Sequence, residues 1–102
     1  MIKVTLIHHD NYIEEIEIKG HAESGPYGQD LVCAAVSSII TGGANALPNK
    51  HNYEIELKSG YALIRSKNHD EEGNKVLNTV WVQLKTVEES YSKFIRIEEK
   101  EN

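Results

Sequence analysis

The feature that most constrains the fold is the alternation of apolar and polar residues near the N-terminus. In "IKVTLIH" the apolar Ile2, Val4 and Leu6 occupy every second position, and a second alternating run, "YIEEIEIKG", follows the polar turn "HDN". Successive side chains of a strand point to opposite faces of a sheet, so each run predicts a strand with one buried face. The chain must therefore build a sheet and cover it.

Two later segments predict the helices that cover this sheet. Asp30 is a good N-cap, and Gly42, Gly43 and Pro48 mark a loosening end, so we expect a helix from about 30 to 46. A second helix is expected over most of 70–91, because its apolar residues recur at steps of three and four and so share one face. These residues are Leu77, Val80, Leu84, Val87 and Tyr91. Trp81 and Val82 lie off that face and indicate either a wide core face or a dimer contact.

The remaining segments complete the predicted topology. "YEIELKSGYALIR" predicts a hairpin in which Tyr53, Ile55 and Leu57 point inward, and "KFIRIE" predicts a last strand before a frayed tail, "EEKEN". The order ββαββαβ indicates an α+β fold with two layers, a mostly antiparallel sheet and two helices. With 102 residues, we expect a single domain over 1–102 with one core.

Composition excludes several classes of function. The net charge of −5 argues against sequence-independent nucleic-acid binding, which depends on lysine and arginine at phosphates. The longest apolar runs are too short to span a membrane, and the N-terminus lacks the features of a secretion signal, so we expect a cytoplasmic protein. If His8 and His9 lay in a strand, their side chains would face opposite ways and could not easily share one metal ion. We therefore expect "HHD" to form a turn rather than a metal site. We expect no metal and no cofactor.

The chain has one cysteine, which excludes an internal disulfide and a multi-cysteine zinc site. If Asp30 is the N-cap, Cys33 falls in the first helical turn, where unpaired amides and the helix dipole favour a thiolate. His21 opens a glycine-containing loop that can return to the same point. The two residues would then form a nucleophile with a general acid–base. A lone cysteine beside "AAVSS" is, however, usually a small buried hydrophobe.

The stretch "GHAESGPYGQDLVCAAVSS", residues 20 to 38, resembles the signature of the bacterial ribosomal-processing cysteine proteases, the Prp family. That signature is Gly-His-Ala, a variable loop with glycine, then Gly-x-Asp-(Ile/Leu)-Val-Cys-Ala-Ala-Val-Ser. The resemblance implies a homodimeric endopeptidase that removes the N-terminal extension from the precursor of large-subunit ribosomal protein twenty-seven. It further implies that Cys33 is the nucleophile, that His21 is its acid–base partner, and that Asp30 and Ser37 support them.

The resemblance also implies a substrate-contacting loop between His21 and the helix. We expect this loop to be mobile in the free protein and to become ordered around the substrate. Its residues are Ala22, Glu23, Ser24, Gly25, Pro26, Tyr27 and Gly28.

Two other functions stay open on the residues alone. One is a redox or acyl-transfer thiol that uses the same Cys33 and His21. The other is a non-enzymatic binding module for a basic ribosomal segment, in which Cys33 serves only for packing. Alkylation across pH separates them, because a packed thiol reacts only on unfolding whereas a nucleophile reacts in the native protein.

Overall fold

The computed structural model describes residues 1–20 and 27–102, with side chains from residue 31 onward in the second range. The described elements are, in order, β1 (Ile2–His9), β2 (Tyr12–Lys19), α1 (Tyr27–Ala46), a short 3₁₀ turn (Lys50–Asn52), β3 (Tyr53–Lys58), β4 (Tyr61–Ser66), α2 (Glu71–Ser90) and β5 (Ile95–Glu101). The order ββαββαβ is confirmed. No helix in the described part of the chain is long and apolar enough to cross a membrane.

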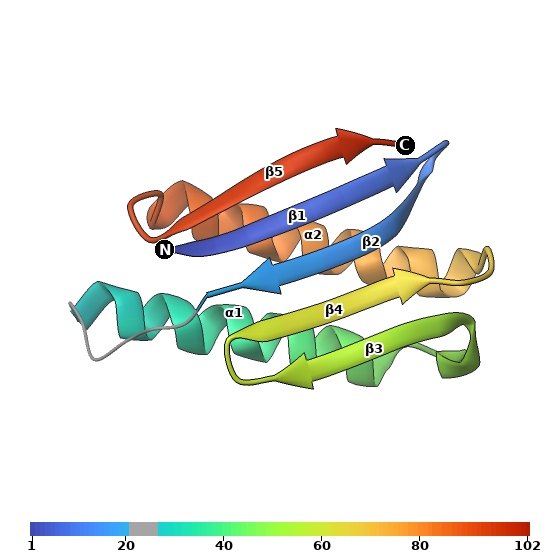
Figure 1. Cartoon of the computed structure of the whole chain (residues 1–102), viewed down its shortest axis with the longest axis horizontal. Coiled ribbons are helices and arrows are strands. Elements are labelled where there is room, and N and C mark those ends of the chain that lie inside the picture. Colours follow the sequence, from blue (N-terminus) through green and yellow to red (C-terminus); the bar gives the residue numbers. More distant parts are fainter. Residues whose placement is uncertain (21–26) are drawn as a thin grey trace.

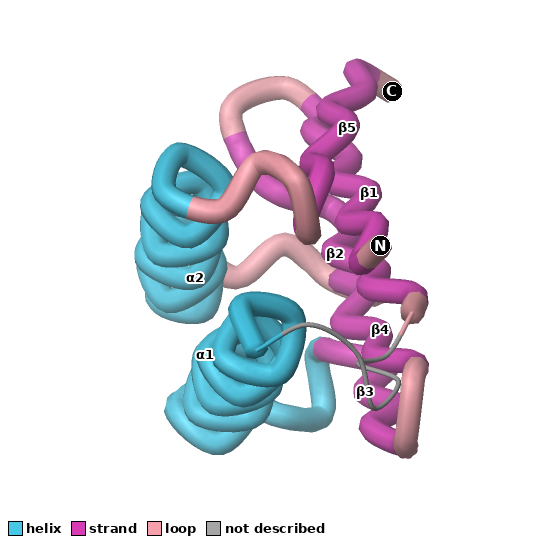
Figure 2. Tube along the Cα trace, turned by 90° about the vertical axis from the view of Figure 1, so that its left-hand side faces the viewer, coloured by secondary structure: helices cyan, strands magenta, loops and turns pink. Residues whose placement is uncertain are grey.

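The strands of the described residues form one five-stranded sheet in the order β3-β4-β2-β1-β5 (Figure 1). The neighbours are antiparallel except β1 and β5, which run parallel from the pair Ile2 and Ile95 to the pair His8 and Glu101. Both helices lie on the same side of the sheet (Figure 2). The predicted two-layer, mostly antiparallel architecture is therefore confirmed. The expectation of a frayed tail is wrong, because β5 continues to Glu101 by pairing with β1.

The core lies between the sheet and the two helices. Ile2, Val4 and Leu6 of β1 are buried as their alternation predicts, and Leu77, Val80 and Leu84 of α2 pack against them in one cluster. Trp81 packs against the edge of this cluster, whereas Val82 is exposed. In the β3–β4 hairpin, Tyr53 is buried as predicted, whereas Leu57 lies on the same predicted inward face but is 41% exposed. Leu57 borders a cavity instead of packing into the core.

The start of α1 differs from the prediction. The helix begins at Tyr27, so Asp30 lies inside it and is not its N-cap, and Tyr27 and Gly28 belong to the helix and not to the preceding loop. Pro26 directly precedes the first helical residue in the sequence. Proline is well tolerated at a helix start because its missing N–H would have no helical partner there. The helix therefore starts one turn earlier than the aspartate indicated.

Candidate functional site

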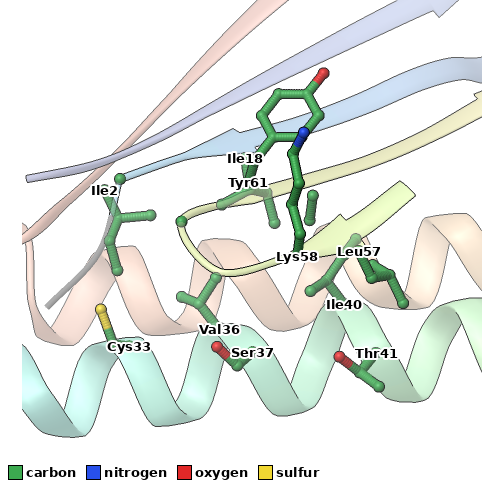
Figure 3. A pocket seen from close by; sticks show the side chains of 13 residues that line it. Ile2, Ile18, Cys33, Val36, Ser37, Ile40, Thr41, Leu57, Lys58 and Tyr61 are labelled. Carbon is green, nitrogen blue, oxygen red and sulfur yellow. The ribbon is translucent and has the colours of Figure 1, made fainter. Parts of the chain in front are cut away.

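Cys33 lines an open cavity of about 290 Å³ at the end of the molecule where β1 starts and β2 stops (Figure 3). One wall is α1, which supplies Cys33. The other wall is formed by Ile2 of β1, the end of β2 and the β3–β4 hairpin. The cysteine side chain is half-buried, and Figure 3 shows its sulfur pointing from α1 toward Ile2. This thiol is therefore accessible from the cavity rather than enclosed in the core.

Cys33 lies further into α1 than the sequence predicts, and this position affects how its thiol can be activated. With α1 starting at Tyr27, Cys33 lies beyond the first helical turn. Only the first four amides of a helix lack a helical acceptor, and the dipole effect fades within that turn. The expectation that Cys33 sits in the first turn is wrong. A neighbouring side chain can therefore activate this thiol more effectively than the N-terminus of the helix can.

Gly20 brings the end of β2 to the same cavity. Its φ is +114°, and a Cβ at this position would lie 2.6 Å from the main-chain oxygen of Met1, so only glycine fits here without strain. Its amide donates a hydrogen bond to the carbonyl of Gly60 at 3.0 Å. Gly20 lines the cavity together with Cys33, which places the residue directly before His21 beside the thiol.

Not all of the predicted site falls within the described residues. His21 and the loop residues Ala22, Glu23, Ser24, Gly25 and Pro26 lie outside them. Asp30 is placed by its backbone only, in the first turn of α1. Ser37 follows Cys33 by one helical turn and lines the same cavity (Figure 3). The structure thus brings together Cys33, Ser37 and the chain segment that leads into His21.

The hairpin contributes cavity residues that sequence reasoning missed. Leu57, Lys58, Gly60 and Tyr61 all line it. The hydroxyl of Tyr61 donates a hydrogen bond to Glu17 at 2.7 Å. This bond, with partial burial and the nearby negative charge, raises the pKa of Tyr61 to about 12. Tyr61 therefore stays protonated at neutral pH and acts here as a fixed neutral group. Only the "SG" turn signals these residues in the sequence.

His8 and His9 lie in β1, so the prediction that they form a turn is wrong, and the turn consists of Asp10 and Asn11. Both histidines lie away from this cavity and have separate partners. His8 lies 3.1 Å from a carboxylate oxygen of Glu99, whereas His9 contacts the main-chain oxygen of Asn102. Within residues 1–20 and 27–102, the structure shows no cluster of three or more histidine, cysteine or acidic side chains that could hold a metal ion.

Comparisons with known proteins point to one family. The family model described as "Cysteine protease Prp" matches residues 1–96. The ribosomal processing cysteine protease Prp of Staphylococcus aureus is 31% identical over 103 residues, which cover 95% of this chain and 97% of that protein. The protein of the same name from Mycoplasma pneumoniae is 38% identical over 104 residues, covering 97% and 95%.

Solved structures agree with these sequence matches. The crystal structure of Prp from S. aureus in complex with a substrate peptide has a TM-score of 0.87 at 32% identity, covering 98% of this chain and 100% of that chain. A second structure of S. aureus Prp, in complex with a covalently linked product peptide, has a TM-score of 0.81 at 34% identity, with coverage of 98% and 100%.

Proposed function

This chain belongs to the Prp family of cysteine proteases, and we propose that it removes the N-terminal extension from the precursor of large-subunit ribosomal protein twenty-seven. The observation that carries the proposal is the shared cavity of Cys33 and Gly20. Cys33, the proposed nucleophile, faces open space there, and Gly20 directly precedes His21, its proposed partner, in the sequence. The ribosomal substrate comes from the resemblance, and the name of the S. aureus relative supports it at the level of ribosomal processing.

In the proposed mechanism the thiolate of Cys33 attacks the carbonyl carbon of the scissile bond. His21 takes the thiol proton and passes it to the leaving amine, so that the new N-terminus departs and a thioester remains on Cys33. Water then attacks the thioester, with His21 as the base, and releases the extension. The covalently linked product peptide on the S. aureus relative supports a covalent intermediate.

Three further roles belong to this proposal. Ser37 lines the cavity one turn from Cys33, and its hydroxyl is suited to hydrogen-bond the substrate backbone near the reacting carbonyl. Asp30 is proposed to support the site from the first turn of α1. The segment from Ala22 to Gly28 is proposed to contact the substrate, with Tyr27 and Gly28 acting from the start of α1 rather than from a loop.

We further propose that the enzyme acts in the cytoplasm as a homodimer, as the family resemblance implies. Light scattering during size-exclusion chromatography gives the mass in solution. A mass near 23 kDa, twice the 11.5 kDa of one chain, is the expected result, and a mass of one chain contradicts the dimer.

The direct test uses the precursor ribosomal protein from the same cell. The purified enzyme is incubated with this precursor, and the products are identified by intact-mass spectrometry. We expect one cut that leaves the mature protein and the released extension, and no cut with the Cys33→Ala enzyme. An intact precursor after long incubation with folded wild-type enzyme overturns the proposed substrate.

A further inference from the structure

Leu57 is an apolar side chain left uncovered on the sheet face that the helices otherwise cover. Tyr53, two positions before Ile55 on the same face, is buried, and Ile55 is half-buried, yet Leu57 is 41% exposed. A single exposed leucine is ordinary on a protein surface. This one lines the cavity that contains Cys33, so it is available to a molecule bound in the proposed active site.

The cavity is a groove that runs along α1 from Cys33 toward Leu57. Cys33, Ser37 and Thr41 line it at intervals of four residues, so they lie on one face of the helix. The eight residue steps from Cys33 to Thr41 correspond to a length of about 12 Å along the helix axis. Figure 3 shows Cys33 at one end of this row, and Leu57 at the end where Ile40 and Thr41 lie.

The walls of the groove combine apolar side chains, hydroxyls and the positive charge of Lys58, whose Nζ lies 5.5 Å from the centre of the Tyr61 ring. Apolar side chains come from α1 and from the sheet beside it, and the hydroxyls of Ser37 and Thr41 lie along the helix. The apolar residues are Ile2, Ile18, Val36, Ile40, Leu57 and Ala62. Such a surface suits an extended peptide whose backbone hydrogen-bonds the hydroxyls while one side chain is buried at the apolar end.

We infer that the end of the groove formed by Ile40, Thr41 and Leu57 is a specificity subsite for an apolar side chain of the substrate. An extended chain advances about 3.3 Å per residue, so about 12 Å places this side chain three or four residues from the scissile bond. Leu57 is the specificity-determining residue, because it is the exposed apolar side chain at this end of the groove and a substrate side chain can pack against it. The inference rests on the proposed function only in taking Cys33 as the nucleophile.

The test reads specificity without assuming the ribosomal substrate. Wild-type enzyme, Leu57→Ala and Leu57→Lys are each incubated with a library of peptides made from a digested proteome, and mass spectrometry aligns the products at their cut sites. We expect wild type to favour apolar residues at one position, three or four residues from the cut. Leu57→Ala should weaken that preference about tenfold, which is typical for lost contacts in an apolar pocket, and Leu57→Lys should abolish it.

Val82→Ala is the matched control, since Val82 is an exposed apolar residue of α2 that does not line the groove. It should leave the preference at every position unchanged. An unselective position at that distance in wild type, or the same preference in Leu57→Ala, overturns the subsite. A cleaved library with an intact ribosomal precursor contradicts only the proposed substrate, so the two failures are distinguishable.

If no library peptide is cleaved, binding decides the question. Cys33→Ala enzyme with labelled leucine methyl groups is titrated with an apolar tetrapeptide and with its lysine-substituted counterpart. We expect the Leu57 methyl resonances to shift with the apolar peptide at concentrations where the lysine peptide has no effect. Equal shifts, or none with either peptide, overturn the subsite.

Discussion

At the scale of single residues, removing the sulfur of Cys33 should change activity but hardly change the stability of the fold. Cys33 is half-buried at the edge of the core and faces a cavity, so Cys33→Ala removes one heavy atom from a place already open to solvent. We expect loss of peptide hydrolysis with a change in unfolding free energy within about 1 kcal/mol. Cys33→Ser should be nearly as inactive, because a hydroxyl ionises far less readily than a thiol. Hydrolysis and urea unfolding of the three proteins measure both effects, and a wild-type rate in Cys33→Ala contradicts the nucleophile.

The prediction for His21 rests on the sequence motif and on the position of Gly20. His21→Ala should lower kcat by a factor of about 100 or more, as expected for a lost general acid–base, with little change in stability. The rate is followed against pH, and a thermal melt is recorded for each protein. A melting temperature lowered by many degrees would show instead that His21 serves the fold.

Tyr53 gives a prediction about alkaline stability. Burial, and then the charge and hydrogen bond of Asp70, raise the pKa of Tyr53 from 10.0 to about 12. The folded state therefore holds this proton more tightly than the unfolded chain does. Its contribution to stability is fully present below pH 10 and is lost as the pH rises from 10 through about 12. In urea unfolding across that pH range, Tyr53→Phe should lose less unfolding free energy than wild type. Tyr91→Phe is the control and should lose as much as wild type. Identical pH slopes for wild type and Tyr53→Phe would refute the assignment.

At the scale of elements, two adjacent glycines of α1 report on how the helices pack. A Cβ at Gly43 would collide with Cγ2 of Val80 on α2, whereas a Cβ at Gly42 meets no described atom within 4 Å. Alanine favours a helix over glycine by about 0.5–1 kcal/mol, so Gly42→Ala should stabilise the protein by that amount. Gly43→Ala should instead destabilise it by about 1–3 kcal/mol through overpacking. Urea unfolding measures both, and stabilisation by both substitutions would mean that α1 and α2 are not in close contact.

At the scale of the whole molecule, the two ends of the chain are joined through the sheet. β5 pairs with β1 in parallel, and Ile95 beside Ile2 is only 1% exposed. Ile95→Ala should cost about 2–5 kcal/mol, the usual range for a buried isoleucine. Ile97→Ala, two residues on and half-buried, is the control and should cost clearly less. Equal costs in chemical denaturation would show that the start of β5 does not anchor the N-terminal strand.

Sequence patterns were sufficient to predict the order of the elements and most of the faces that they bury. The alternation of Ile2, Val4 and Leu6 and the spacing of Leu77, Val80 and Leu84 each show a strand or helix face, because such periodicity depends only on local backbone geometry. The positions of Cys33 and Ser37, one turn apart on a helix, also follow from local spacing. The start of α1 did not follow, since a good N-cap residue such as Asp30 does not exclude an earlier start, and the helix begins at Tyr27.

The surroundings of Cys33 depend on how segments far apart in the chain pack together. The cavity needs Gly20 held against Met1 and Gly60, and the β3–β4 hairpin placed beside β2. Each of these is a contact between residues far apart in the chain, and strand order is not encoded in the period of any one strand. Leu57 shows the physical reason most clearly. Its alternation marks it as inward-facing, but whether an inward face is filled by core or left open depends on where a distant helix lies.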